Sequence, residues 1–575
     1  MGAKSRRSTT LSAPQTRAQD KAFVQQCGFA GLRSQLPLRW PTPPDVPDSP
    51  KKKYRSQYVY LGFDDLDEQA NWEDLSLFDL VLRLVDFGGL RPVLAHLLGW
   101  TSARGQVPFD PVSLFLFVSW RLVNGWSRAQ ALRNLHHTRY ADYAAAFGFR
   151  EGDFPTEGGV RYFQTTLGKR SNEDTESVSV AIDATRKVEI AVQRLNQLIV
   201  SSVALLRKAG LITPSAWQAA LIGADGQIHD AASRRRCSFV QGVCYRSLKE
   251  ESRPCRAKEK RKRGCDCDTL ACVQVCRHAP VRDPEARCVV YEGSNQRRTS
   301  SPNVPTNPGD AKPSRGKLRY GFRSLALQFA EPIRRFSVVL LDDFLSANAR
   351  EENPATALLL QLQRFYPDLG IDVVAADAGF GYYAFLHAIY QLGAKRVVDL
   401  RADPSDQNKT QWTVRGYDDK GRPVCPFGYP FTANGFDSHR QRHKWFCARA
   451  CLTDKSPLVQ LEKIKYPPEE CPFQDPAHPH GKVINLAETF GDGRIRLARD
   501  IPVGTPTWKR FYARARNAAE DRNSDLEAWY LKRLPVYGKP RGRALIALAD
   551  IWINLFVLAR LVREATFAAD TLHGD

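Results

Sequence analysis

The sequence lacks an uncharged apolar run long enough to cross a membrane. Its longest apolar run, residues 544–562, contains Asp550, Asn554 and Arg560, and each of these side chains is costly in lipid. The first 25 residues contain no continuous apolar stretch, because basic residues, Ser and Thr interrupt them, so a secretory signal peptide is not expected. We therefore expect a buried helix at 544–562, no membrane partner and a cytoplasmic, reducing location.

Acidic residues are outnumbered by basic ones. Lys plus Arg total 83 against 62 for Asp plus Glu, so the chain of 575 residues has a formal net charge of +21. This balance favours a polyanionic partner such as nucleic acid, although a ribosomal or membrane-surface protein has a similar charge. The length suits roughly three domains.

A compact Cys-x-x-Cys pair is absent, although the chain has 13 cysteines. In a reducing compartment, cysteines are more often metal ligands or core thiols than disulfides. Apart from Cys27 they form two groups, which are Cys237, Cys244, Cys255, Cys265, Cys267, Cys272, Cys276 and Cys288, and then Cys425, Cys447, Cys451 and Cys471. The irregular spacing of the first group assigns no individual zinc ligands.

The second cysteine group has the four thiols that a closed structural zinc site needs. Cys447 and Cys451 are one helical turn apart and can face one ion, while Cys425 and Cys471 each precede a proline. We predict a structural Zn²⁺ bound by these four thiols. The alternative is four thiols that are buried separately in an apolar insertion.

Changes in composition divide the chain into six segments. Residues 1–70 are rich in Pro, Ser, Lys and Arg and predict a flexible basic arm. Apolar residues at helical spacing in 71–175 predict a helical domain, whose arginines favour DNA binding. The remaining segments are a linking helix in 176–215 (about 177–209), a core in 216–400 interrupted by a cysteine-rich insertion at 233–295, a second insertion at 401–504, and a helical end at 505–575 (helix from about 507 to 569).

The core segment has short β-branched and apolar runs at residues 220–224, 336–341, 373–376 and 396–398. Strands that alternate with helices indicate an α/β domain. Basic residues between these runs stand in a Pro- and Ser-rich context that predicts a loop; they are Arg297, Arg298, Lys312, Arg315, Lys317 and Arg319.

Two aspartates follow apolar runs of this core. Asp225 stands at or near the end of the first run and precedes Gly226, and Asp377 follows the run 373–376 and precedes a helical pattern. Aspartates that close neighbouring strands can share a cation, and their oxygens suit Mg²⁺ or Mn²⁺, the ions of phosphoryl transfer. Each Asp-Gly pair or Asp-containing turn is, taken alone, also a common turn former.

A third carboxylate lies in the C-terminal helical segment. Arg516 and Glu520 are one helical turn apart and face the same way. A carboxylate flanked by arginines can bind a metal while its neighbours, here Arg516 and Arg522, hold phosphates. Glu527 is an alternative to Glu520, because seven residues on a helix return a side chain to nearly the same face.

These blocks resemble the insertion-sequence DDE transposases, a group of the ribonuclease H-like superfamily. The resemblance rests on Asp225-Gly, Asp377-Ala-Gly-Phe and the Arg516–Glu520 stretch followed by Asn-Ser, in this order, and the Cys425 region resembles a subfamily with a cysteine-bearing insertion. The family carries a lysine where this chain has Glu527, and Lys532, Arg533 or Lys539 is a possible substitute for that lysine.

The resemblance implies a ribonuclease H-like mixed-sheet core with an all-helical N-terminal domain. It implies Asp225, Asp377 and Glu520 as catalytic ligands of two Mg²⁺ or Mn²⁺ ions, and Arg516, Arg522, Lys532 and Arg533 as DNA contacts. The expected activity is cleavage of double-stranded transposon-end DNA and its joining to target DNA by a homodimer. Two alternatives are a zinc-stabilised DNA-binding protein without chemistry and a non-transposing nuclease of the same fold.

Overall fold

The computed structural model describes the chain in sections. These are residues 35–43, 46–48, 53–60, 74–100, 106–169, 177–181, 186–191, 193–233, 283–291, 317–332, 334–381, 383–398, 416–417, 422–425, 429–437, 442–453, 481, 483–487 and 506–570. The N-terminal arm predicted for residues 1–70 lies largely outside them. So do seven of the eight cysteines of the first group, whereas Cys288 lies on strand β6 (Arg287–Tyr291).

A group of short helices follows the arm. They are α3 (Leu77–Leu84), α4 (Leu90–Leu97), α5 (Pro111–Val123), α6 (Arg128–Leu135), α7 (Ala141–Ala146) and α8 (Glu157–Leu167). Polar side chains cap the starts of four of them, as Asp110 does for α5 and Ser127 for α6. The helical prediction for this part of the chain is confirmed. A two-residue parallel pair, β1 (Leu38–Arg39) with β2 (Val85–Asp86), joins the arm to it.

The prediction of one linking helix at 177–209 is wrong in its first half. Strands β3 (Ser177–Ala181) and β4 (Lys187–Ala191) pair antiparallel there, and only α9 (Asn196–Lys208) is helical. Val178 and Val180, and Val188 and Ile190, alternate with other residues at the period of a strand. Their β-branched side chains favour the extended backbone, so the hairpin forms before the helix begins.

A mixed sheet forms the centre of the molecule. Its strand order is β10-β9-β5-β7-β6, and β8 also pairs with β7. The strands are β5 (Ala220–Asp230), β7 (Lys317–Ala330), β8 (Ser337–Ser346), β9 (Ile371–Ala376) and β10 (Lys395–Val398). β5, β9 and β10 run parallel, whereas β7 runs antiparallel to β5 and to β8. All four predicted strands are present.

Strand β7 is the element that the sequence analysis assigned in part to a loop. Lys317 and Arg319 begin this strand, and Arg319 Nε donates to Asp230 Oδ1 at 2.8 Å. Pairing with β7 also extends β5 to Asp230, so Asp225 lies in the middle of its strand rather than at its end. Gly321 permits the close approach of the two strands, because a Cβ there would lie 1.9 Å from the His229 carbonyl oxygen.

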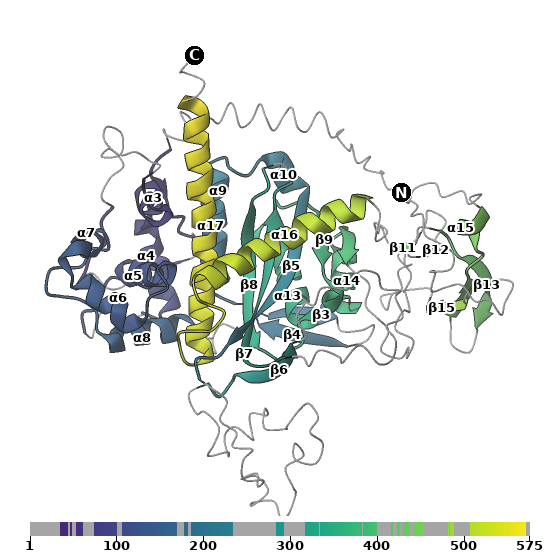
Figure 1. The fold of residues 1–575 in the computed structure, drawn as a ribbon, viewed down its shortest axis with the longest axis horizontal. Coiled ribbons are helices and arrows are strands. Elements are labelled where there is room, and N and C mark those ends of the chain that lie inside the picture. The colour runs from purple at the N-terminus through teal and green to yellow at the C-terminus, as the bar shows by residue number, and fades with distance from the viewer. Residues whose placement is uncertain are drawn as a thin grey trace, which may run out of the picture.

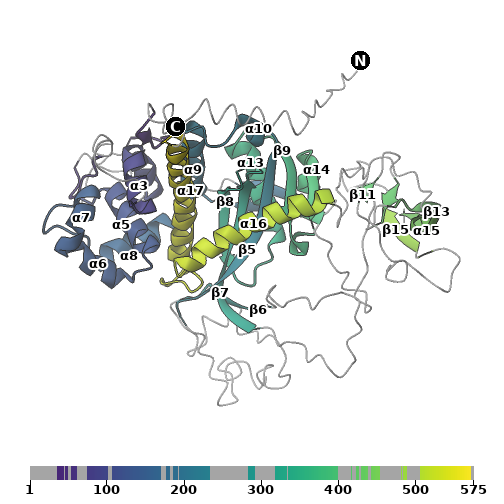
Figure 2. The same cartoon turned by 45° about the horizontal axis from the view of Figure 1, so that its top comes forward.

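Helices cover both faces of the sheet (Figures 1 and 2). α16 (Pro506–Ala528) crosses one face, where Leu221, Val373 and Ala375 pack against it. Residues that alternate with these, such as Ile222 and Val374, belong to the core on the other face, which is covered by α13 (Glu352–Phe365) and α14 (Tyr383–Gln391). Strand alternation thus presents two apolar faces to two helical layers.

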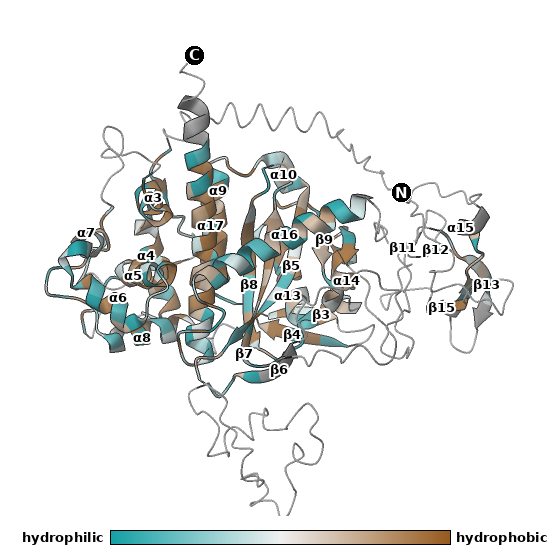
Figure 3. Ribbon diagram, in the orientation of Figure 1, coloured by the Kyte–Doolittle hydropathy of each residue, from teal (hydrophilic) through white to brown (hydrophobic). Residues whose placement is uncertain are grey.

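The long helix α17 (Lys539–Asp570) packs between the N-terminal helices and the sheet. It contacts α3, α8, α9 and β8, and Figure 3 shows its apolar surface inside the molecule. Residues 539–564 are long and apolar enough to cross a membrane, yet 89% of the most apolar window is buried against other elements. The buried helix predicted at 544–562 is confirmed. The single C-terminal helix expected from 507 is instead two helices, which separate at residues 529–538 around Pro535 and Gly538.

A buried ion pair joins α16 to α17. Arg522 donates from Nε and Nη2 to the two carboxylate oxygens of Asp550 at 2.7 and 2.8 Å, and its side chain is 2% exposed. Its Nη1 also reaches Ser324 Oγ, which hydrogen-bonds His229. Burial lowers the pKa of His229 to about 4, so the imidazole is neutral at pH 7. Arg522, which the sequence analysis placed on the DNA surface, therefore lies in the core and reaches no phosphate in this conformation.

Removal of one partner of this ion pair should be costly. Arg522→Met leaves the Asp550 carboxylate buried without a counter-charge, and we expect it to lower the free energy of unfolding in urea by about 3–5 kcal/mol. The double variant Arg522→Met, Asp550→Leu should recover most of that loss. Lys395→Met, which breaks an exposed ion pair with Asp372, is the control and should cost under about 1 kcal/mol. Equal losses of unfolding free energy in Arg522→Met and Lys395→Met would contradict this account of the core.

Candidate active site

Two neighbouring strands bring Asp225 and Asp377 together. In the parallel pairing of β5 with β9, Ala224 lies opposite Ala376, and each aspartate is the next residue along its strand. Asp377 directly follows β9 and precedes a 3-10 turn (Ala378–Phe380), in which the Gly379 N–H donates to Asp377 Oδ1 at 2.8 Å. The predicted juxtaposition of the two aspartates is therefore present, although only Asp377 follows the end of its strand.

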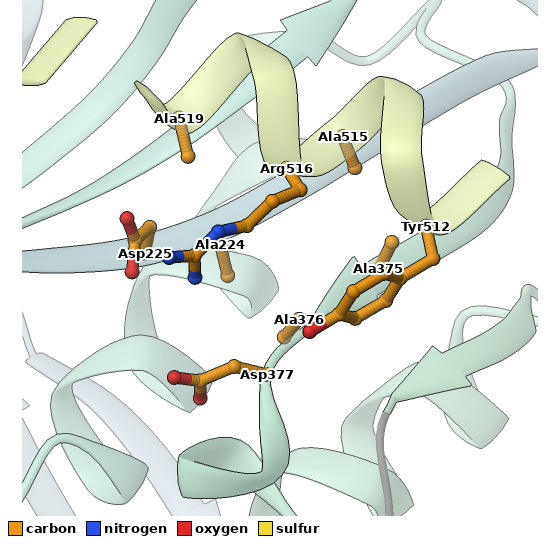
Figure 4. Close-up of a pocket in the computed structure, with 9 residues that line it drawn as sticks. All are labelled: Ala224, Asp225, Ala375, Ala376, Asp377, Tyr512, Ala515, Arg516 and Ala519. Carbon is orange, nitrogen blue, oxygen red and sulfur yellow. The ribbon is translucent and has the colours of Figure 1, made fainter. Parts of the chain in front are cut away.

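Helix α16 closes the space over these aspartates into a pocket (Figure 4). The pocket is lined by Ala224, Asp225, Ala375, Ala376, Asp377, Tyr512, Ala515, Arg516 and Ala519. Small residues at 515 and 519 allow the helix to approach the sheet, and a Cβ at Gly223 would lie 3.2 Å from the Ala515 carbonyl oxygen. Small side chains on both elements thus leave room for the few polar ones.

Three polar side chains of α16 surround the aspartates. In Figure 4 the Arg516 guanidinium extends toward Asp225, and Tyr512 points toward the strand end at Ala376. Asn523 Nδ2 donates to Asp225 Oδ2 at 3.1 Å. The Tyr512 ring stacks on Trp508 with centroids 4.3 Å apart, which orients its hydroxyl end toward the pocket. One helix therefore supplies a cation, a phenol and an amide to one cavity.

The electrostatics of the pocket centre on Asp225. Burial raises the pKa of the Asp225 carboxyl, the charge of Arg516 opposes that rise, and the nearby Asp377 adds to it. Two carboxylates that repel each other in a buried site gain from a shared cation, because a cation removes both the repulsion and the cost of burial. Oxygen donors of this type are those that Mg²⁺ and Mn²⁺ prefer.

Glu520 lies on the expected helix but does not line the pocket. Its Oε1 accepts from Arg516 Nε at 2.9 Å, and its side chain is 59% exposed. It directly follows Ala519, which lines the pocket, so a change of side-chain rotamer is the movement that would turn it inward. Glu527 is further along α16 and pairs with Lys532 Nζ at 2.7 Å.

Glu351 is a carboxylate of this region that the sequence analysis did not select. It precedes α13, forms an ion pair with Arg323 of β7, and its Oε1 lies 3.0 Å from the position of a Cβ on Gly226. Burial raises its pKa to about 7; Arg323 opposes this rise, and Asp377 and Asp225 add to it. Its sequence signal was weak, because Glu351 belongs to no strand-end motif and approaches the aspartates only through the tertiary fold.

The part of the chain that the structure describes contains no group of three or more His, Cys, Asp or Glu side chains arranged to hold a metal ion. Asp225 and Asp377 form a two-carboxylate site, to which Glu520 or Glu351 would add a third ligand by moving. The donor types fit a hard divalent cation. Of the expected DNA contacts besides Arg516, Lys532 is 57% exposed, and Arg533 donates from Nη2 to the Ala232 carbonyl oxygen.

Comparison with protein-family models and with curated proteins found no match.

Three of the four cysteines expected to bind zinc lie in one cluster. The described parts of the second insertion form a three-stranded sheet of β13 (Thr432–Asp437), β14 (Arg442–Phe446) and β15 (Val483–Ala487), with a pair β11 (Gly416–Tyr417) and β12 (Pro423–Val424) and helix α15 (Ala450–Thr453). Cys425, Cys447 and Cys451 pack together there with aromatic side chains. Cys471 lies outside the described residues. The three described thiols share this apolar cluster but are not arranged as a group of metal ligands, so Zn²⁺ binding remains a prediction.

Zinc analysis tests this cluster. Cys425→Ser, Cys447→Ser and Cys451→Ser should each lower the zinc content of the purified chain by about one equivalent, because a structural site needs four ligands. Cys27→Ser, the cysteine outside both groups, is the matched control and should keep the wild-type content. Unchanged zinc in all three cluster variants would show that these thiols are buried separately.

Proposed function

We propose that this chain is a metal-dependent DNA transposase of the DDE type with a ribonuclease H-like core. The observation that carries the proposal is the juxtaposition of Asp225 and Asp377 beneath a helix that bears Arg516 and Glu520. The resemblance implied Asp225 on the first strand of a mixed sheet, Asp377 after a later strand, and the third carboxylate on a C-terminal helix. The order of β5, β9 and α16 in the chain supports each of these expectations.

Each side chain has a role in this proposal. Asp225 and Asp377 hold divalent cations, and Glu520 leaves Arg516 to join them when DNA binds. Arg516, released from Glu520, then faces a phosphate of the DNA, and Lys532 and Arg533 contact the backbone further along. Bound in pairs, Mg²⁺ or Mn²⁺ ions supply a nucleophile and stabilise the leaving oxygen of an in-line displacement.

The protein side of the reaction is mainly positioning. The rigid strands fix the two aspartates relative to each other, and α16 fixes the phosphate-binding arginine relative to them, so the attacked phosphate has one orientation. Strand cleavage releases a 3′-hydroxyl, and the same geometry allows that hydroxyl to attack target DNA. The partners we propose are double-stranded transposon ends and target DNA, bound by a homodimer in the cytoplasm, at the nucleoid if the source is bacterial.

Labelled duplexes that carry the DNA ends flanking the gene test this function with Mg²⁺. Wild-type protein should cleave them and join them to a plasmid. Asp225→Asn and Asp377→Asn should lower cleavage about 10³-fold, because a cation's stabilisation of transition-state charge is worth several kcal/mol, while end binding persists. Cleavage that survives in both variants would overturn the proposal, and cleavage without joining would favour the nuclease alternative.

The same cleavage assay identifies which glutamate is the third metal ligand. Glu520→Gln should lose cleavage to a similar extent, and Glu527→Gln, on the same helix, is the matched control and should retain most of it. Glu351→Gln separates the remaining possibility. If Glu351→Gln is inactive while Glu520→Gln is active, Glu351 is the third ligand and the role of Glu520 is wrong.

A further inference from the structure

Arginines from distant parts of the sequence meet where the N-terminal helices join the start of α17. Arg128 is the first residue of α6, Arg161 lies on α8, and Arg541 lies in the first turn of α17. Burial lowers the pKa of Arg541 first, and the positive charges of Arg128 and Arg161 lower it further, with Asp283 opposing them least. Figure 1 shows α8 beside the end of α17 at which the chain enters it, with α6 next to α8.

Burial, and after it the positive charge of Arg128, lowers the pKa of Arg121, so this side chain belongs to the same arginine cluster. The arginine cluster comprises Arg121, Arg128, Arg161 and Arg541, and few negative charges balance it. Glu157 Oε1 accepts a hydrogen bond from Arg161 Nη2 at 3.1 Å and forms an ion pair with Arg128 Nη1, which lies 3.3 Å away. Among the described residues, no carboxylate forms an ion pair with Arg541 or with Arg121. One glutamate is thus paired within a group of four guanidinium groups.

Arg121 supplies an independent sign of a missing partner. Its side chain is 2% exposed, and it donates from Nε to the Trp126 carbonyl oxygen, yet its Nη1 has no hydrogen-bond partner. Buried polar groups are normally hydrogen-bonded, so each orphan requires an explanation. Arg128 likewise has a buried Nε without a partner. These two buried guanidinium groups therefore keep positive charge that the protein does not fully compensate, beneath the more exposed Arg161.

Stability does not explain these positions. Arg128 and Arg541 stand in the first turns of their helices, where the helix dipole disfavours positive charge. A helix start favours an anion for the same reason, because the positive end of the helix dipole lies there. Arginines at these two helix starts lower the stability of the free protein, and the same positions favour a bound anion. We take this combination as the sign of an anion-binding site.

The junction that carries the arginine cluster is rigid. A Cβ on Gly168, at the end of α8, would lie 1.7 Å from the Pro540 carbonyl oxygen, and Arg543 Nη1 donates to the Gly168 carbonyl oxygen at 3.0 Å. On the other side, the ring of Tyr530 packs over Gly125, where a Cβ would lie 2.5 Å away. The arginines are therefore held in place before any ligand binds, which lowers the entropic cost of binding.

We propose that the arginine cluster binds the phosphodiester backbone of duplex DNA at a distance from the pocket of Asp225 and Asp377. This inference rests on the proposed function for its choice of polyanion. The loop 529–538, with Lys532 and Arg533, leads from α16 to the arginine cluster.

Salt-dependent binding tests the proposal. The affinity of the full chain for a fluorescein-labelled end duplex is measured by anisotropy at about 50 to 200 mM KCl, without divalent cations. Arg161→Gln and Arg541→Gln should each weaken binding several-fold and reduce the slope of log K against log[KCl] by about 0.9, the value for one lost phosphate contact. Arg364→Gln, an exposed arginine on α13 with the same charge change, is the matched control and should alter neither.

Thermal unfolding separates binding from folding. Because Arg541 is repelled by its neighbours, Arg541→Gln should melt at the wild-type temperature or above it while its DNA affinity falls. If the wild-type protein binds the duplex and the Arg161→Gln, Arg541→Gln double variant has the same slope of log K against log[KCl], the arginine cluster does not bind DNA. That result would leave the proposed function intact. Absence of duplex binding by the wild-type protein would overturn both.

Discussion

Parallel pairing of β5 with β9 is the constraint on which the candidate site depends. The register places Ala224 opposite Ala376, which stands 152 residues later in the chain. A shift of one residue would turn Asp225 to the face covered by α13 and separate it from α16. The register is fixed by burial on both faces, because Ile222 and Val374 pack on one side and Leu221 and Val373 on the other.

Helix α16 is the second fixed part of the site, and its anchors lie outside the pocket. Arg522 holds its C-terminal half to Asp550 of α17, and Arg514 donates from Nε to the Glu331 carbonyl oxygen at 2.7 Å at the end of β7. Arg516, which lies between these anchors, and Asn523, which directly follows Arg522, both face Asp225. Buried, charge-assisted hydrogen bonds of this kind fix orientation as well as contributing energy. α17 therefore supports the candidate site, the core and the arginine cluster at once.

The sequence predicted those features that depend on local pattern. The apolar runs before Asp225 and Asp377 marked two strands of the sheet, and the helical spacing around Arg516 marked α16. The sequence analysis did not predict features that depend on residues distant in the chain. Nothing near Arg522 in the chain indicates that it will be buried in an ion pair with Asp550. The basic residues at the start of β7 predicted a loop, because the sequence does not show that Arg319 pairs with Asp230 of the neighbouring strand. The hairpin at 177–191 was missed because short segments with Val and Ile fit both a strand and a helix.

The central claim of this account is that Asp225 and Asp377 share a divalent cation, and Mn²⁺ binding tests it most directly. Titration of the purified chain with Mn²⁺, with the free ion measured by electron paramagnetic resonance, needs no knowledge of the DNA ends. The account predicts binding by wild-type protein and at least about tenfold weaker binding by Asp225→Asn and by Asp377→Asn, since each loses a ligand. Asp372→Asn, on the same strand β9 but paired with Lys395, should bind as wild type does. Mn²⁺ binding of wild-type strength in both Asp225→Asn and Asp377→Asn would contradict the account.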